Sequence, residues 1–373
     1  MFRRILSVVM VLPIFLYVLE FECFAVSASS YVLYDPLLDE IYSGVDYNVK
    51  RSMASTTKIM TGLLLCENAD LEKEITITDD MLKVEGTSIG IRSGDTIKYE
   101  NLLYGLLLES GNDAANAIAI SLCGSYCSFA AMMNKRASEI GMTNTNFVTP
   151  SGLDDDDHYT TAYDMALLAA VAMENDLFKK VVSSKTYKSV YNNEGTVVTY
   201  YNHNKLLGTY EGICGIKTGF TKKSGRCLVS ACERNGRMLI VVTLNAPDDW
   251  NDHRSLYDYG YSLFDTFTLG GDEIYTECIV GGSIDAISVV STSEDVYLNT
   301  KIADKLERKI MLSQFTYAPV HCRDEVGKVC YTYNNVLIAE LPLIANQSVG
   351  VKSAQIKEEN KMLKIFKDIL SIK

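Results

Sequence analysis

The sequence predicts an α/β unit built around an antiparallel sheet, followed by a small all-β unit. Residues 31–52 read as two short strands, apolar residues at helical spacing occupy 99–142 and 161–173, and strand patterns return after Tyr200. Strands at both ends of a helical block imply one sheet that joins the two ends. Residues 274–352 contain short alternating strands and turns, with no cluster of candidate catalytic groups.

Turn residues mark the ends of these elements. Ser43-Gly44 is expected to join the first two strands, and Asn235-Gly236 to form a hairpin between two apolar runs. A helix at residues 255–264 closes the α/β unit, and the boundary falls near residues 269–271. We therefore expect an α/β domain at 29–268 and a β-rich domain at 272–352.

Length and charge limit the class of protein. A chain of 373 residues is long enough for about two domains, and its 47% of hydrophobic residues can fill a core in each. The formal net charge of −12, without a long basic run, argues against nucleic acid as a partner, because a polyanion would be repelled.

Residues 1–28 have the pattern of a signal peptide. Two arginines precede an apolar run at 5–19, and small residues end the segment, with cleavage after Ala28 or Ala25. The apolar run is short for a membrane span, which needs about 20 residues, and a retained anchor is the alternative. The pattern predicts an exported protein.

The chain has ten cysteines, an unusual content for an exported protein. One of them, Cys23, leaves with the signal peptide. The pairs Cys123/Cys127 and Cys227/Cys232 lack the spacing and nearby histidines of a metal site. We expect the remaining cysteines to be mostly free, buried thiols.

The stretch "MASTTKIMT" begins at Met53 and leads into an apolar helix. Ser55 is either a helix cap or, with Lys58 one turn away, a nucleophile beside its base. A serine hydroxyl is a poor nucleophile until a neighbour accepts its proton. A lysine can do so where burial and nearby cations lower its pKa.

Two further motifs lie at element boundaries. Ser110-Gly111-Asn112 interrupts a helical pattern and either projects a hydroxyl and an amide into a cleft or is a plain helix break. Lys217-Thr218-Gly219 lies on a predicted strand. Its cation, hydroxyl and close backbone suit a substrate carboxylate, unless it is a strand end with a solvated lysine.

Together, S-x-x-K, S-x-N and K-T-G in this order resemble the serine acyl-transferases that include penicillin-binding proteins and β-lactamases. The stretches "LLYGLLLESGNDAANAIA", "NFVTPSGLDDDDHYTTAYDMALLA" and "GICGIKTGFTKKSGRCLVSA" are similar to the D-alanyl-D-alanine carboxypeptidases among the low-molecular-weight penicillin-binding proteins. The segment "FTYAPVHCRDEVGKV" resembles the β-rich domain that follows in that family. The implied fold is a β-lactamase/transpeptidase-like α/β domain followed by an all-β domain.

This resemblance implies roles for the site residues. Ser55 would attack the carbonyl of a terminal D-Ala-D-Ala and release D-alanine, with Lys58 as the base. Ser110 and Lys217 would relay a proton to the leaving amine. The residues implied in substrate binding are Asn112, Lys217, Thr218, Gly219 and Phe220, and the backbone N–H groups of Ser55 and Phe220 would form the oxyanion hole.

The resemblance also implies the partners. These are peptidoglycan stem peptides that end in D-Ala-D-Ala and, as covalent inhibitors, β-lactam antibiotics. No cofactor and no metal are expected, and the protein would work at the outer face of the cytoplasmic membrane or in the cell wall. Two positions depart from the pattern. Gly111 stands where many members of the wider superfamily carry Asp, and a further carboxylate-binding arginine has one candidate, Arg254.

Other motifs give weaker signals. Residues 86–90, "GTSIG", match the G-x-S-x-G nucleophile elbow around Ser88 but lack the preceding strand and the following helix. The run Asp154–Asp157 is either a solvated acidic loop or a weak calcium site. The four histidines, His158, His203, His253 and His321, have no metal spacing and are expected to be structural or exposed.

Three other functions stay open. A β-lactamase shares the three motifs but adds a carboxylate that activates the deacylating water, and residues 150–170 contain no Glu. A penicillin sensor keeps the reactive serine as a binding module but is normally attached to a transmembrane region. A structural wall protein needs no intact catalytic set.

Residues 355–373 have an amphipathic pattern. At helical spacing, apolar residues from Ile356 to Ile372 share one broad face, and lysines gather on the other. The pattern favours a C-terminal helix that lies on an anionic membrane surface as an anchor. The alternative is a helix docked on the β-rich domain.

Overall fold

The computed structural model describes residues 25–191, 195–271, 273–352 and 366–370. Most of the expected signal peptide, residues 1–28, lies outside this part of the chain. Of the expected C-terminal helix at 355–373, only residues 366–370 are described.

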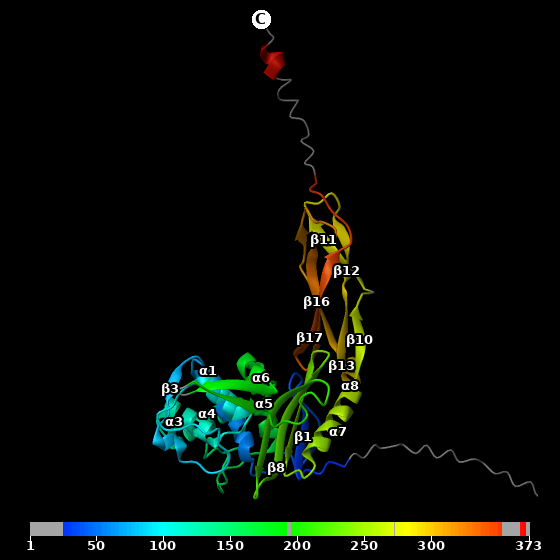
Figure 1. The fold of residues 1–373 in the computed structure, drawn as a ribbon. Coiled ribbons are helices and arrows are strands. Elements are labelled where there is room, and N and C mark those ends of the chain that lie inside the picture. Colours follow the sequence, from blue (N-terminus) through cyan, green and yellow to red (C-terminus); the bar gives the residue numbers. More distant parts are fainter. Residues whose placement is uncertain (1–24, 192–194, 272, 353–365, 371–373) are drawn as a thin grey trace, which may run out of the picture.

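A five-stranded antiparallel sheet of order β2-β1-β9-β8-β7 forms the centre of the α/β unit (Figure 1). Its strands span Ser30–Asp35 (β1), Glu40–Val45 (β2), Ile213–Thr221 (β7), Gly225–Arg234 (β8) and Arg237–Leu244 (β9). Because β1 pairs with β9, the two ends of the unit meet in one sheet, as predicted.

The two predicted hairpins have different outcomes. Asn235 and Gly236 join β8 to β9 with φ values of 49° and 74°, which confirms that turn. Ser43 and Gly44 instead lie inside β2 and pair with β1, so the turn predicted there is wrong. The chain turns at residues 36–39, where Asp39 has a φ of 52°.

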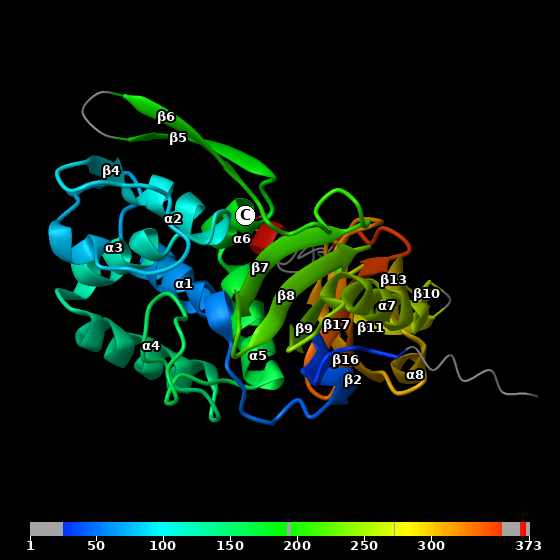
Figure 2. The ribbon, with the colours of Figure 1, turned by 60° about the horizontal axis from the view of Figure 1, so that its bottom comes forward.

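Helices cover both faces of the sheet (Figure 2). One set of alternate sheet residues packs with α5, and the other set packs with α7. The helices span Lys58–Asn68 (α1), Tyr99–Leu107 (α2), Asn112–Cys123 (α3), Tyr126–Ile140 (α4), Ala162–Glu174 (α5), Asp176–Val182 (α6) and Asp249–Ser262 (α7). The predicted helical block is confirmed, and α7 begins earlier than the helix predicted at 255–264.

Two short hairpins border the helical part of the unit. One pairs β3 (Glu74–Thr76) with β4 (Thr96–Lys98), and a 3-10 turn, η2 (Asp79–Leu82), lies between them. The other pairs β5 (Thr186–Tyr191) with β6 (Thr196–Tyr201) and is absent from the sequence prediction. It is fixed by a stacked pair of rings, Tyr187 on Tyr104 of α2, with centroids 3.5 Å apart.

The all-β unit extends away from the α/β unit as an elongated body (Figure 1). A two-stranded ribbon, β10 with β13, leads into a six-stranded sheet of order β14-β16-β17-β12-β11-β15. The elements are Phe264–Gly270 (β10), Ile274–Val280 (β11), Ala286–Ser291 (β12), Ser293–Asn299 (β13), Thr300–Ala303 (α8), Glu307–Leu312 (β14), Thr316–Tyr317 (β15), Glu325–Tyr333 (β16) and Val336–Ala345 (β17).

The two units are joined without a linker. Leu263 caps the C-terminus of α7 and Phe264 begins β10. Phe264 is buried in the same apolar cluster as Leu33 and Tyr257 of the α/β unit. A second contact lies nearby, where the Tyr333 hydroxyl donates to Glu40 Oε1 at 2.8 Å.

All nine described cysteines are free thiols. Cys227, Cys232 and Cys330 are buried, but Cys127, Cys278 and Cys322 are exposed and the other three are intermediate, so the expectation of mostly buried thiols is wrong. Among the described residues, no single helix is long and apolar enough to cross a membrane. The pair α3 and α4 meets that test only when joined across an 87° bend.

Candidate active site

Ser55 lies in a 3-10 turn, η1 (Ala54–Thr57), directly before α1. Ala54 has a φ of 47°, in the left-handed region, which turns the chain sharply at this point. Gly152, with a φ of 87°, packs against the turn so closely that a Cβ there would lie 1.9 Å from the Ala54 carbonyl oxygen. The turn that presents Ser55 is therefore held from one side by a position that only glycine fits.

His158 supports the same turn. The Val148 N–H donates to Nδ1 of His158 at 2.9 Å, so Nε2 carries the ring proton and donates to Thr57 Oγ1 at 2.8 Å. Burial lowers the pKa of His158 to about 4, which keeps the ring neutral. This histidine has the structural role that the sequence analysis expected.

Lys58 is the first residue of α1 and is fully buried. Its Nζ donates to Ser55 Oγ at 3.0 Å, to Asn112 Oδ1 at 2.7 Å and to the Ser151 carbonyl oxygen at 2.6 Å. Three contacts use all three donors of an ammonium group. Burial and then the positive charge of Lys217 hold the pKa of Lys58 well below its ordinary value, while Asp113 acts in the opposite direction.

Ser110 and Asn112 come from the break between α2 and α3. Ser110 adopts a φ of 64° and lines the cleft, and Asn112 begins α3. Gly111 lies between them, where an added Cβ would come within 2.8 Å of Ile89 Cγ2. The break therefore needs a small residue at this position, which accounts for glycine in place of Asp.

The loop of residues 85–90 lies over this break. Asn112 Nδ2 donates to the Glu85 carbonyl oxygen, and the Asn112 N–H donates to the Thr87 carbonyl oxygen at 2.8 Å. Asp113, which is 1% exposed, accepts hydrogen bonds from Ser88 Oγ at 2.6 Å and from the Gly90 N–H at 3.0 Å. Ser88 thus serves as a donor that fixes the loop, and the nucleophile-elbow pattern around it has no counterpart in the fold.

The strand β7 forms the opposite wall. Lys217 is buried, its Nζ donates to the Thr218 carbonyl oxygen at 2.9 Å, and burial lowers its pKa to about 7. A Cβ on Gly219 would lie 3.0 Å from the backbone nitrogen of Ser55, so glycine lets the strand approach the nucleophile turn. Phe220 follows on β7 and is exposed at the rim.

These elements enclose an open cleft of about 350 Å³. It is lined by Ser55, Thr87, Ser110, His203, Lys205, Thr218, Gly219, Phe220, Arg226, Asp249 and Trp250. The cleft brings together Ser55, Ser110, Thr218 and Gly219. Lys58 contacts Ser55 and Asn112 from behind the cleft, and Lys217 on β7 is buried. The buried amine of Lys58 lies beside the hydroxyl of Ser55, and both lie next to β7, which carries Lys217. This arrangement suits acyl transfer to serine.

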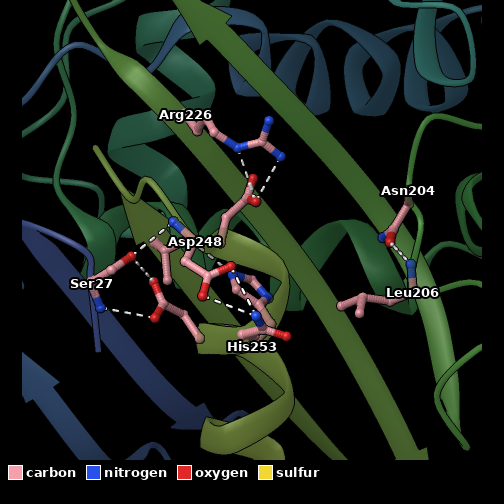
Figure 3. Close-up of polar contacts among 10 residues, drawn as sticks. Ser27, Asn204, Leu206, Arg226, Asp248 and His253 are labelled. Atoms are coloured by element: carbon pink, nitrogen blue, oxygen red, sulfur yellow. Dashed lines mark hydrogen bonds and ion pairs between the residues drawn. The ribbon is translucent and has the colours of Figure 1, made fainter. Parts of the chain in front are cut away.

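Arg226 is the arginine that reaches this cleft, and the sequence analysis did not single it out. It is the second residue of β8, and its Nε and Nη2 donate to Asp249 Oδ1 at 3.0 and 2.7 Å; Figure 3 draws these two contacts as dashed lines at Arg226. The guanidinium also lies over the Trp250 ring, 5.6 Å from its centroid. Arg254, the candidate from the sequence, donates to Thr209 and does not line the cleft.

The acidic run at Asp154–Asp157 lies at the surface. Asp154 accepts a hydrogen bond from Thr221 Oγ1 at 2.9 Å, and Asp156 pairs with Lys223. Among the described residues, no group of His, Cys, Asp or Glu side chains is arranged to hold a metal ion.

Comparisons with known proteins agree with this geometry. The profile of the family described as D-alanyl-D-alanine carboxypeptidase matches residues 19–248, and that of the penicillin-binding protein 5 C-terminal domain matches residues 265–351. The D-alanyl-D-alanine carboxypeptidase DacC of Escherichia coli is 31% identical over 349 residues, covering 88% of this chain and 86% of its own length. DacF of Bacillus subtilis is 28% identical and covers 86% of each chain.

The fold agrees as well. The crystal structure of penicillin-binding protein 5 from Haemophilus influenzae superposes with a TM-score of 0.62 at 26% identity, covering 87% of this chain and 98% of that one. With one family profile spanning the α/β unit and a second spanning the all-β unit, the chain belongs to the D-alanyl-D-alanine carboxypeptidases, the serine peptidases of peptidoglycan metabolism that bind penicillin.

Proposed function

We propose that Ser55 is the nucleophile of this carboxypeptidase and that Lys58 is its base. The observation that carries the proposal is the contact between Lys58 Nζ and Ser55 Oγ at 3.0 Å inside the cleft. A neutral Lys58 accepts the Ser55 proton as Oγ attacks the carbonyl of the penultimate D-alanine. The C–N bond then breaks, terminal D-alanine leaves with a proton on its amine, and water later hydrolyses the acyl-serine ester.

The remaining site residues bind the substrate and move protons. Ser110 lines the cleft beside Ser55 and, with Lys217, delivers the proton to the leaving amine. Asn112 holds the substrate amide. The backbone N–H groups of Ser55 and Phe220 stabilise the oxyanion, a role supported by the close approach of Gly219 to Ser55.

The terminal carboxylate of the substrate is the group that needs a cation. Lys217 and Thr218 supply one set of donors on β7, and Arg226 supplies a guanidinium at the far edge of the same cleft. Arg226 is fixed by Asp249 through Nε and Nη2, so Nη1 is the nitrogen that a substrate carboxylate would meet.

One assay tests this function against its alternatives. D-alanine release from a peptide that ends in D-Ala-D-Ala is measured beside penicillin turnover, with the same enzyme preparation. The proposal requires stoichiometric penicillin labelling, rapid D-alanine release and slow penicillin hydrolysis. Rapid penicillin turnover would instead identify a β-lactamase, and labelling without D-alanine release would identify a penicillin sensor.

We propose further that the protein is exported and held at a membrane by its C-terminal residues 355–373. The amphipathic sequence supports this, and in the described part of it Phe366, Ile369 and Leu370 are 66%, 64% and 80% exposed. These apolar side chains are thus not buried on the β-rich domain. Deletion of 355–373 should release most of the protein from anionic vesicles while turnover of a soluble peptide stays within about threefold. Loss of folding on deletion would favour the docked helix.

A further inference from the structure

The end of the all-β unit that lies farthest from the α/β unit is built from three chain segments (Figure 1). They are residues 280–285, 315–320 and 347–352, which we call the distal tip. Val280 pairs with Tyr317 between β11 and β15, and Gly282 forms a bridge with Val351. The tip is therefore one continuous surface made by residues far apart in sequence.

Apolar side chains are exposed together on the distal tip. The members and their exposed fractions are Val280 (44%), Ile284 (42%), Phe315 (44%), Tyr317 (67%) and Val351 (63%). Phe315 and Tyr317 contact each other edge to face, with centroids 5.3 Å apart. Exposed apolar residues scattered singly are ordinary, but a group of this size on one end indicates a binding surface.

The tip has a rigid base. Ile279, Val320 and Val349 are buried in one apolar cluster directly beneath it, and the Val320 and Val349 backbones exchange hydrogen bonds of 3.0 and 2.7 Å. The exposed side chains therefore stand on an ordered sheet end, and little conformational freedom is lost when they are covered.

The charge of the tip differs from that of the whole chain. Within the three segments that form it, Asp285 and Lys352 are the charged residues and their charges cancel, whereas the complete chain has a formal net charge of −12. An anionic surface would repel the average surface of this protein but not this end of it.

We propose that the distal tip is a second membrane contact, which places Ile284, Tyr317 and Val351 in the interfacial region of an anionic lipid bilayer. Val351 and Lys352 end the third segment of the tip, and residues 353–373 follow directly in the chain. The proposed membrane tail therefore begins at the tip. Tyrosine and other amphipathic rings favour the boundary between headgroups and acyl chains. This inference rests on the proposed tail, which brings the tip to the membrane.

The test compares two sets of substitutions in the full chain. The tip variant is Ile284→Ser/Tyr317→Ser/Val351→Ser. The matched control is Val190→Ser/Val197→Ser/Tyr201→Ser, three residues of similar type and exposure (52%, 62% and 59%) on the β5–β6 hairpin of the α/β unit. Each is made with and without residues 353–373 and mixed with vesicles of phosphatidylglycerol and phosphatidylcholine. The bound fraction is measured by sedimentation.

The tip variant of the full chain should bind the vesicles about tenfold more weakly than the wild type, and the control should bind like the wild type. Without residues 353–373, the wild type should retain weak binding that the tip variant lacks. Equal binding of tip variant and wild type in both backgrounds would overturn the inference and leave the tail proposal standing. Tip-dependent binding that is unaffected by the deletion would overturn the tail proposal alone.

A second measurement distinguishes a lipid bilayer from the other possible occupants of the tip. Tyr317→Trp in a Trp250→Phe background places the only tryptophan on the tip, because Trp250 is the single tryptophan of the chain. Its fluorescence should shift to the blue on vesicles and be quenched by brominated lipid. Absence of quenching would overturn the membrane contact and leave the tail itself as the occupant. A tip variant that changes the sedimentation mass without changing lipid binding would also overturn it and would identify a second copy as the occupant.

Discussion

The buried nitrogen of Lys58 is held 2.7 Å from the side-chain oxygen of Asn112. An amide oxygen only accepts hydrogen bonds, so this contact survives when Lys58 loses a proton. The Ser151 carbonyl oxygen holds a second N–H in the same way, at 2.6 Å. Two fixed acceptors leave the lone pair of neutral Lys58 directed at Ser55, so Asn112 helps to orient the amine.

The nucleophile can be tested with two serines of the same cleft region. Ser55→Ala should abolish D-alanine release and covalent labelling by penicillin, because both need the same hydroxyl. Ser88→Ala is the control, since the Ser88 hydroxyl donates to Asp113 and accepts from the Gly90 N–H within the 85–90 loop, and it should still be labelled. Mass spectrometry of the labelled protein locates the adduct, and a penicillin adduct on Ser88 would contradict the assignment.

The base can be tested by its protonation. Because burial first and Lys217 second lower the pKa of Lys58, the neutral form exists above that lowered value, and acylation should rise as the pH rises through it. Lys58→Arg stays protonated at all these pH values and should lose about a thousandfold in acylation rate. Stopped-flow penicillin acylation measures both. A variant that acylates at the wild-type rate would exclude Lys58 as the base.

Asp113 should affect the pH at which the acylation rate begins to rise. Its charge raises the pKa of Lys58 against the effects of burial and Lys217, so Asp113→Asn should move the rise in activity to lower pH while also loosening the 85–90 loop. Asp164→Asn is the control, because Asp164 is equally buried and accepts from Asn144 and Thr145 without affecting Lys58. An unchanged pH for this rise in Asp113→Asn would show that its role is structural alone.

Arg226 and Arg254 form a matched pair for the carboxylate. Arg226→Gln should raise KM about tenfold or more for peptides with a free terminal carboxylate, and much less for amidated analogues, because a charge-assisted contact is lost only with the former. Arg254→Gln should leave KM nearly unchanged, since Arg254 bonds Thr209 outside the cleft. Equal effects of the two substitutions, measured by steady-state kinetics, would remove Arg226 from the site.

Gly152 and Gly141 separate backbone strain from crowding. Both have positive φ values, 87° and 93°, but a Cβ on Gly141 meets nothing within 4 Å whereas one on Gly152 would overlap the Ala54 carbonyl. Gly141→Ala should cost about 1 kcal/mol of unfolding free energy. Gly152→Ala should cost more than about 3 kcal/mol and reduce acylation, because the nucleophile turn must move. Urea unfolding compares them, and equal costs would contradict the crowding argument.

Local patterns predicted the helices, the Asn235-Gly236 turn and the three motifs, because each depends on neighbouring residues. The prediction of a turn at Ser43-Gly44 was wrong because the glycine has another purpose. A Cβ on Gly44 would come within 2.7 Å of the Tyr47 ring, and the pairing of Gly44 with β1 keeps its backbone extended. The β5–β6 hairpin depends on the stacking of Tyr187 on a distant helix, which no local pattern contains.

The supporting residues of the site were missed for the same reason. Asp113 acts on a loop more than twenty residues earlier in the chain, and Arg226 depends on Asp249 for its position. A carboxylate next to Asn112 and an arginine at the start of β8 are visible in the sequence, but their roles depend on which elements the fold brings beside them. Long-range hydrogen bonds and ion pairs are therefore the part that required the structure.

The direct passage from Leu263 to Phe264 ties the two units together, because Phe264 is buried in the core of the α/β unit and paired along β10 at the same time. The strands beyond it act as a spacer of fixed length. A protein attached by its far end would hold its cleft at a constant height above the surface. With the membrane attachment that we propose, strand length would set the layer of wall that the cleft reaches, and depth in the wall would join chemistry as a determinant of which peptides are cut.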